Sequence, residues 1–211
     1  MKNLILISIL LLFVSCRTIK HCNFKKVEEQ QTDIAQLHSC FKNNFTKVLF
    51  KSTIDIYNNH LGGLILIKLM PDSSYRVNFI TELGLKIFDF EIKGEQFKVV
   101  YCLEKMNKKK LIQVLKDDFT LLLLENKLKD KAILFKNKDN VENIFRFHHK
   151  NSYNYYYVEK NSLTLNKIEN WGCLFRNVTM CFSDFKNNFP TKISISHQHI
   201  KLNIQLNQIA N

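Results

Sequence analysis

Histidine and cysteine are the residues whose types could do chemistry in this chain. His197 and His199 lie two residues apart, so they would share one face of a strand, and His148 and His149 are adjacent. A zinc site needs further ligands, and neither pair has a carboxylate or a cysteine at ligand spacing. The chain also lacks Gly-x-Ser-x-Gly, phosphate-loop, dinucleotide-binding and His-Glu-x-x-His motifs. The sequence therefore predicts no catalytic residue, no metal and no cofactor, and we expect a protein that is not an enzyme.

Six cysteines are spread along the chain without a Cys-x-x-Cys pair. Cys173 and Cys181 could share a strand face, but a strand between them would hold their sulfurs too far apart to bond. Cys22 and Cys40 are the most plausible disulfide, and we expect the other thiols to be buried and inert. If one of the six is modified, five remain, so at least one thiol is unpaired.

The first residues have the pattern of a signal peptide. A basic head with Lys2 precedes an apolar run from Leu4 to Val14 that only Ser8 interrupts. A helix needs about 18 apolar residues to span a bilayer, so this run is too short for a lasting span. We therefore expect the protein to be exported.

Phe13-Val14-Ser15-Cys16 resembles a bacterial lipobox, in which a cysteine thiol receives a diacylglyceryl group before cleavage ahead of it. The usual residue three places before the cysteine is leucine, and here it is Phe13; the alternative is an ordinary signal peptide with a chance cysteine. Cleavage before Cys16 would leave 211 − 15 = 196 residues. Two or three acyl chains hold a protein to a membrane. We predict a signal peptide at 1–15, a lipidated N-terminus and tether at 16–26, and one domain at 27–211.

Composition supports a folded body. Hydrophobic residues make up 45% of the chain and aromatic residues 12%, which suits one domain with a sizeable core. The formal charge of +12 indicates attraction to anionic surfaces, because the basic residues outnumber the acidic ones. For an exported lipoprotein the nearest such surface is its own bilayer, so nucleic acid is not an expected partner.

Residues 75–101 predict three strands joined by tight turns. Apolar residues recur with period two from Tyr75 to Phe79, from Phe88 to Ile92 and from Phe97 to Tyr101. The turns fall at Glu82-Leu83-Gly84 and Lys93-Gly94-Glu95, because glycine takes the backbone angles that tight hairpins need. Leu83 is therefore expected at a turn tip, an unusual place for an apolar residue.

The remaining pattern predicts two helices and further strands. Helical spacing predicts a helix over Glu28 to Lys42 and a second, capped by Asn107, over Lys108 to Leu124 against the concave side of the sheet. On the strand from Tyr153 to Glu159, Tyr153, Tyr155 and Tyr157 share one face and Tyr156 points to the other. These tyrosines are expected to form either part of the core or a lipid-facing belt. The other expected strands are 48–57 and 64–70 around a turn at 58–63, then 132–135, 144–147, 162–168, 174–182 and a closing hairpin over Pro190 to Leu206.

This order of elements resembles the localisation-of-lipoproteins family (LolA/LolB-like), and most closely its outer-membrane acceptor. The resemblance rests on the lipobox, the turn with Leu83-Gly84 and the final hairpin entered through Pro190. It implies an α+β fold that is mainly β: an incomplete antiparallel barrel of roughly eleven strands covered by helices. Because a fold does not settle what is bound, the function that the resemblance implies is an analogy.

The resemblance implies a membrane-anchored lipoprotein that binds acyl chains. In the family's acceptor a leucine followed by glycine at a loop tip helps place lipoproteins in the membrane, and Leu83-Gly84 match it; alternatively, Leu83 folds back onto its own hairpin. The expected partners are acyl chains of lipids or lipoproteins, the membrane and a periplasmic lipoprotein carrier, at the outer membrane facing the periplasm. The alternative is a non-catalytic envelope scaffold with a filled core that binds a protein partner. The residues expected to line the apolar cleft are Leu64, Leu66, Phe88, Phe90, Leu115 and Phe119.

Overall fold

One large antiparallel sheet and one α-helix make up the described part of the chain. The computed structural model describes residues 24–30, 41, 45–125, 132–137, 141–162 and 164–209, with the backbone alone for 24–30 and 136–137. The helices are η3 (Glu104–Met106), a 3-10 turn, and α2 (Lys109–Leu122). The strands are β1 (Phe24–Gln30), β2 (Lys47–Ile56), β3 (Asn59–Leu69), β4 (Tyr75–Thr81), β5 (Lys86–Lys93), β6 (Gln96–Cys102), β7 (Ala132–Asn137), β8 (Glu142–His149), β9 (Ser152–Glu159), β10 (Leu165–Trp171), β11 (Arg176–Lys186), β12 (Phe189–His197) and β13 (Leu202–Gln208).

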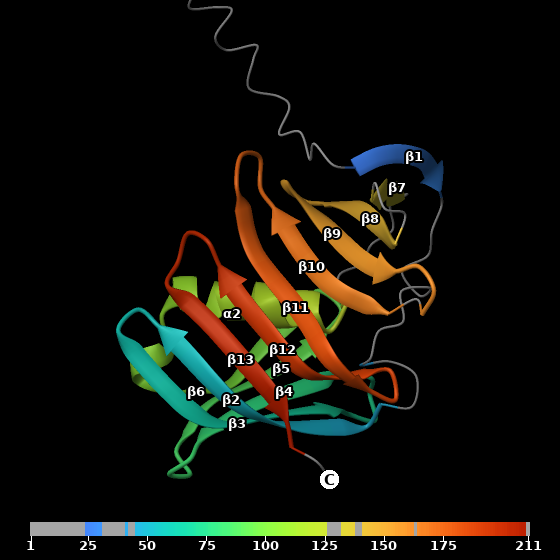
Figure 1. The fold of residues 1–211 in the computed structure, drawn as a ribbon. Helices are drawn as coiled ribbons and strands as arrows, with labels where there is room; N and C mark the ends of the chain where they lie inside the picture. Colours follow the sequence, from blue (N-terminus) through green and yellow to red (C-terminus); the bar gives the residue numbers. More distant parts are fainter. Residues whose placement is uncertain are drawn as a thin grey trace, which may run out of the picture.

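The thirteen strands form a single sheet in the order β1-β7-β8-β9-β10-β11-β12-β13-β2-β3-β4-β5-β6. All neighbouring strands are antiparallel, and most are joined by short hairpins. The sheet curls strongly, but β1 and β6 remain as two separate edges (Figure 1). The structure therefore confirms an open, mainly β architecture, with two more strands than the roughly eleven that the resemblance implied.

Alternating apolar residues create the inner face of the sheet. In β2, Val48, Phe50, Ile54 and Ile56 are buried on one side, as their period of two predicted. Ser52 lies among them and is accommodated because its hydroxyl donates to the Gly63 carbonyl at 3.2 Å. The same alternation buries one face of β4, β12 and β13 in the main core.

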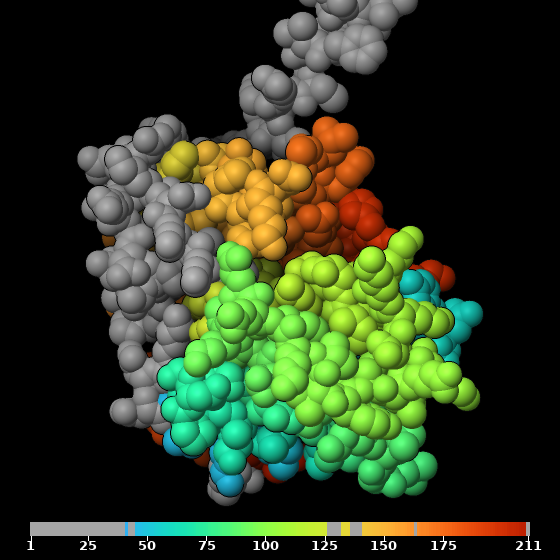
Figure 2. Space-filling model, turned by 180° about the vertical axis from the view of Figure 1, so that it is seen from behind, coloured from blue at the N-terminus to red at the C-terminus, as the bar shows by residue number. Residues whose placement is uncertain are grey.

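Helix α2 packs against this inner face. The Phe119 ring lies 5.9 Å from Phe88 and 6.5 Å from Phe90, whose own rings stack at 4.4 Å. In Figure 1 the helix lies behind β12 and β13, and from behind it forms one surface with the green strands below β8 and β9 (Figure 2). The predicted helix is confirmed, at Lys109–Leu122 in place of Lys108 to Leu124, and its buried residues join the main core; the covering of the sheet by several helices that the resemblance implied is not confirmed. Among the described residues α2 is the only α-helix, and no helix has the length and apolar character of a membrane span.

The end of α2 is tied to the sheet. Leu121 to Leu124 are all buried, which explains why this run of leucines exceeds one helical face. Leu124 takes a left-handed conformation at φ 53°, where the helix ends and Glu125 turns toward the β5–β6 hairpin. The Glu125 carboxylate accepts a hydrogen bond from the Gly94 amide at 2.7 Å. Gly94, at φ 57°, therefore both makes the tight turn and holds the helix end.

The N-terminal part of the chain differs from the sequence prediction. Residues Phe24–Gln30 form β1, paired with β7, where a tether to residue 26 and a helix from Glu28 were expected. Pairing with the free edge of β7 overrides the helical spacing, because that edge offers backbone hydrogen-bond partners. Apart from Phe41, which is buried in a turn, the rest of the predicted helix lies outside the described residues, as do residues 1–23 with the signal peptide and Cys16.

Two local predictions at turns and caps are wrong. The β2–β3 turn comprises Tyr57 and Asn58 alone, so Gly62 and Gly63 lie within β3 and not in the turn. Lys108, not Asn107, occupies the N-cap of α2, and no side chain caps the helix there. The 3-10 turn before it already satisfies the Asn107 amide through the Leu103 and Glu104 carbonyls.

The tyrosine-rich strand β9 is buried on both faces. Tyr156 belongs to the main core, whereas Tyr155 and Tyr157 form a smaller cluster on the outer face with Ile144. Glu169 is buried beside them and accepts hydrogen bonds from the Tyr157 hydroxyl at 2.9 Å and the Trp171 ring at 3.0 Å. The core interpretation is therefore confirmed for these three tyrosines.

The two adjacent glycines of β3 should differ in how well they tolerate substitution by alanine. A Cβ at Gly63 would lie 2.2 Å from the Ile80 carbonyl oxygen and 2.8 Å from the Thr81 Cα, so the strands would have to separate. A Cβ at Gly62 would meet only the Glu82 side chain, at 3.5 Å. We expect Gly63→Ala to lower the free energy of unfolding by about 2–3 kcal/mol and Gly62→Ala to change it by less than about 0.5 kcal/mol. Urea unfolding measures both, and equal effects would contradict the close approach.

Candidate functional site

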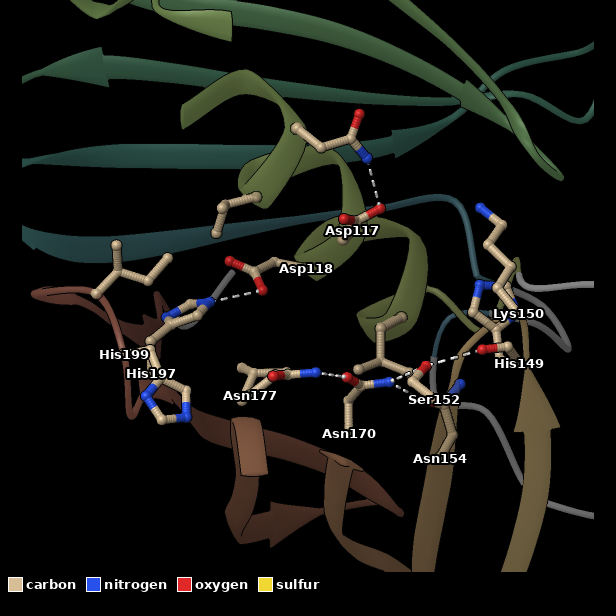
Figure 3. A pocket seen from close by; sticks show the side chains of 15 residues that line it. Asp117, Asp118, His149, Lys150, Ser152, Asn154, Asn170, Asn177, His197 and His199 are labelled. Carbon is tan, nitrogen blue, oxygen red and sulfur yellow. Dashed lines mark hydrogen bonds and ion pairs between the residues drawn. The ribbon is translucent and has the colours of Figure 1, made fainter. Parts of the chain in front are cut away.

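A groove runs between α2 and the strand ends that it faces, and it contains two cavities. Both are lined by Gln113 and Val114 of α2 and by Ile200 of the β12–β13 loop, so they adjoin one another. We call this hollow the α2 groove. Figure 3 shows its polar part, with the helix on one side and the strands on the other.

The first cavity of the α2 groove is mainly apolar and has a volume of about 560 Å³. Its apolar walls come from the end of β2, the first turns of α2 and the start of β13. The apolar side chains that form these walls are Ile56, Leu111, Val114, Ile200 and Leu202. Lys109, Lys110 and Lys201 complete the lining, so methylene stems and ammonium groups surround the same hollow.

The second cavity, of about 510 Å³, is lined largely by polar side chains. Asn154, Asn170 and Asn177 come from the adjacent strands β9, β10 and β11 and form a row. Asn170 donates to the Asn154 side-chain oxygen at 2.6 Å and to the Ser152 hydroxyl at 3.0 Å, and Asn177 donates to Asn170 at 2.7 Å. The asparagine row therefore faces α2 as a preorganised set of amides (Figure 3).

Asp118 of α2 and His197 of β12 form a buried pair at the edge of the second cavity. The His197 Nε2 lies 3.0 Å from Asp118 Oδ1, and its Nδ1 lies 2.9 Å from the Leu202 carbonyl oxygen. Both side chains are less than 5% exposed. Because the carbonyl can only accept, Nδ1 carries a proton, and a second proton bridges Nε2 and the carboxyl group. The pair therefore links the helix to the sheet through shared protons.

The environment makes this pair hold its proton tightly. Burial alone would lower the pKa of His197, but the hydrogen bond and charge of Asp118, with the Leu202 carbonyl, raise it overall. Burial raises the pKa of Asp118, and the hydrogen bond and charge of His197 offset only part of that rise. Sequence analysis considered His197 only together with His199 and did not single out Asp118, because a partner 79 positions away leaves no local pattern.

The six residues expected to line an acyl-chain cleft fall into two groups in the structure, four in the core and two on the outer face of the sheet. Phe88, Phe90, Leu115 and Phe119 come together as predicted, but they pack against one another with exposures of 0–2% and fill the space. Leu64 and Leu66 lie on the outer face of β3, opposite the buried Ile65 and Ile67. None of the six lines either cavity of the α2 groove. Both faces of β3 are apolar in sequence, so the pattern could not tell which one points inward.

Leu83 stands at the tip of the β4–β5 turn with 98% of its side chain exposed. It therefore does not fold back onto its own hairpin. Gly84 follows at φ 80°, a conformation that suits glycine, and its amide donates to the Thr81 carbonyl at 2.9 Å.

Several turns share one end of the sheet with Leu83, because successive hairpins alternate between the two ends of an antiparallel sheet. We call these turns the loop rim: residues 57–58, 82–85, 150–151, 172–175 and 198–201. In the described part of the chain six large apolar side chains are more than half exposed, and five of them lie on the loop rim. These are Tyr57, Leu83, Leu85, Leu174 and Phe175.

The remaining thiols and histidines do not form a metal-ligating group among the residues that the structure describes. Cys173 and Cys181 are exposed and Cys102 is half-buried, all three as free thiols, so the prediction of buried thiols is wrong for the first two. They lie on the outer face or in a turn, where no core surrounds them. Cys22 and Cys40 lie outside the described residues, and their predicted disulfide stays a prediction.

The His197 pair predicts a pH dependence of stability. The pKa of His197 is raised in the folded state above its ordinary value of 6.5. The stabilisation that protonated His197 provides is therefore complete below about pH 6.5 and is lost as the pH rises through the folded-state pKa. Asp118→Asn removes the carboxylate that raises the pKa, whereas Asp117→Asn on the exposed face keeps it. We expect the urea midpoint of the wild type and of Asp117→Asn to fall more between about pH 6 and about pH 9 than that of Asp118→Asn. Equal falls in all three proteins would contradict the pairing.

Comparison with known proteins shows similarity at the level of the fold. No family model and no curated protein matches the sequence. A LolA superfamily protein from Nitrosomonas europaea has a similar structure, with a TM-score of 0.58, 11% identity and coverage of 87% of this chain and 93% of that one. A DUF1329 family protein from Desulfovibrio piger is similar with a TM-score of 0.52 and 9% identity over 83% of this chain and 90% of that one. The chain therefore has a LolA-like fold, as the sequence resemblance implied, and the comparison does not single out the outer-membrane acceptor.

Proposed function

We propose that this chain is an envelope lipoprotein that binds the acyl chains of lipids or lipoproteins in the α2 groove. The observation that carries the proposal is the apolar cavity between Val114 and Leu202, which opens at the same loop rim as Leu83. Its volume of about 560 Å³ falls within the range of small-molecule sites. The likeness to a LolA superfamily protein supports the same class of role.

Hydrophobic burial would provide the affinity. Each Å² of apolar surface removed from water contributes roughly 25 cal/mol, so a flexible chain gains by lying along the apolar walls. Lys109, Lys110 and Lys201 would cover the chain with their methylene stems and direct their charges toward an anionic membrane surface. The net charge of +12 acts in the same direction.

The α2 groove replaces the interior of the sheet as the acyl site. Phe119 packs against the stacked rings of Phe88 and Phe90, and entry of a chain there would require α2 to leave the sheet. The groove lies on the other side of the helix and is open without such a movement. We therefore assign cargo to the groove and assign a structural role to the aromatic residues expected in the cleft.

The sequence supports a site of lipid attachment and a cellular location for the protein. Cys16 would be the lipidated residue after removal of residues 1–15, and the segment after it would act as the tether. The stretch from Arg17 to Lys20 lacks the acidic cluster that surface-export signals often show, which favours the periplasmic side of the outer membrane. In this position the protein could accept lipoproteins from a periplasmic carrier and place them in the membrane.

A second candidate function is a non-catalytic scaffold that binds a protein partner. The observation that favours it is the filled interior, since the aromatic residues of β5 and α2 leave no space where the family resemblance places a cleft. A scaffold would bind no acyl chain in the groove. The next experiment separates the two functions.

A charge in the apolar cavity should abolish acyl binding. Val114→Glu would place a carboxylate against the chain, and we expect it to weaken binding of a fluorescent fatty acid at least tenfold, because an unpaired charge is costly to bury. Val100→Glu on the exposed strand β6 is the matched control and should bind as the wild type does. Absence of saturable binding to the wild type would support the scaffold instead.

The β4–β5 turn should contact the membrane. Burial of one leucine contributes about 1.5–3 kcal/mol, so Leu83→Glu should reduce the partition of unacylated protein onto anionic vesicles by about tenfold or more. Val141→Glu changes an apolar residue that is also more than half exposed but lies at the opposite end of the sheet, and it should leave partition unchanged. Vesicle flotation measures both, and equal losses would remove Leu83 from the membrane contact.

Acylation should depend on one cysteine. Metabolic labelling with a radioactive fatty acid should mark the wild type and Cys22→Ser but not Cys16→Ser, which should also remain unprocessed. Labelling of Cys16→Ser would contradict the lipobox.

A further inference from the structure

Two residues that line the polar cavity of the α2 groove each have a buried side-chain atom without a hydrogen-bond partner in the described part of the chain. Asp118 Oδ2 and Asn154 Nδ2 have no hydrogen bond to any described residue, although both residues line the cavity and are only 2% and 1% exposed. A buried polar atom left unsatisfied costs about 1–3 kcal/mol. Two such atoms in one cavity, one on the helix and one on the sheet, indicate that something else completes their bonding.

In each residue the other polar side-chain atom already has a hydrogen-bond partner, so the chemistry of the unpaired atom is known. Asn154 accepts from Asn170 through its oxygen, so its nitrogen is left to donate. Asp118 bonds His197 through Oδ1, so Oδ2 is left to accept. A ligand must therefore present an acceptor to the sheet and a donor to the helix.

We propose that this cavity binds a polyol, such as a saccharide ring or a glyceryl group, through hydroxyl groups at its two ends. A hydroxyl both donates and accepts, so one hydroxyl of the ligand can donate to the Asp118 carboxylate while a different one accepts from the Asn154 amide. The asparagine row is held rigid by its own hydrogen bonds, so little side-chain entropy is lost on binding. The volume of about 510 Å³ exceeds that of one water many times over and suits a sugar ring.

The charges around the cavity favour a neutral ligand over an ionic one. Asp117 and Asp118 oppose an anion, whereas Lys150 and the proton shared by His197 oppose a simple cation. His149 also lines the cavity, and burial, aided by the Lys150 charge, lowers its pKa, so its ring is neutral near pH 7. Hydroxyl groups match this mixed lining better than a phosphate or an ammonium group does.

The polyol has two possible sources, and the position of the cavity suggests how to separate them. The polar and apolar cavities adjoin at Val114, so a hydroxylated headgroup and its acyl chain could occupy both at once. A free saccharide would occupy the polar cavity alone. The polyol site therefore goes beyond acyl binding and does not depend on it.

Calorimetric titration of the full chain with three probes tests the proposal. Methyl glucoside has the hydroxylated ring alone, octyl glucoside adds a chain, and octyl phosphocholine has the chain without ring hydroxyls. We expect both glucosides to bind, and Asn154→Ala and Asp118→Asn to weaken them roughly three- to tenfold, the effect of one hydrogen bond. Asn78→Ala removes a buried amide with an unpaired atom outside the cavity and should leave binding unchanged. Similar affinities for the two glucosides would identify a free saccharide, and tighter binding of octyl glucoside an acylated headgroup.

Two results would overturn the polyol site. One is that neither glucoside binds, which would leave water alone as the partner of the two atoms. The other is that octyl glucoside binds no better than octyl phosphocholine and is unaffected by Asn154→Ala and Asp118→Asn, which would leave only the apolar cavity. If Asn154→Ala unfolds, the side-chain amide resonance of Asn154 in the wild type must shift on addition of methyl glucoside. Binding of a fatty acid and binding of methyl glucoside to the wild type are separate measurements, so the acyl proposal and the polyol proposal fail separately.

Discussion

Packing of Phe119 against Phe88 and Phe90 is the contact on which the arrangement of the whole molecule depends. It fixes α2 to the inner face of a sheet that never closes, and it fills the interior that an open barrel would otherwise leave empty. The burial of these rings is complete, and deletion of one of them would cost several kcal/mol. Since these rings fill the space between α2 and β5, a ligand beside the helix would lie in the hollow on its other side, the α2 groove.

The helix has a second attachment of a different kind. The Asp118–His197 pair and the Glu125–Gly94 hydrogen bond are polar contacts to β12 and to the β5–β6 hairpin. Such contacts specify direction, because they work only at one rotation of the helix. They turn the polar residues of α2 toward the asparagine row, and the apolar residues before them toward β2 and β13. The two halves of the α2 groove thus follow from one helix orientation.

The strands were predictable where one face is apolar and the other polar, as in β2 and β13. Prediction was ambiguous in β3, where Leu64 and Leu66 alternate with Ile65 and Ile67, because period two gives two equivalent apolar faces. It failed at β1, since pairing with β7 is a long-range contact that local spacing does not encode. Leu83 could be placed at a turn tip because Gly84 marks the corner. The partnership of Asp118 with His197 spans 79 positions and carries no local signal, so no sequence pattern predicted it.

Photocrosslinking tests directly whether a bound acyl chain lies in the α2 groove. A fatty acid with a photoreactive diazirine near its end, irradiated in complex with the purified protein, labels whatever lines its site. If the chain lies in the α2 groove, adducts will form on residues of the apolar cavity, among them Leu111, Val114 and Leu202. Adducts on Phe88, Phe90 or Phe119 would show that the helix leaves the sheet to admit the chain, and would contradict the assignment of cargo to the α2 groove.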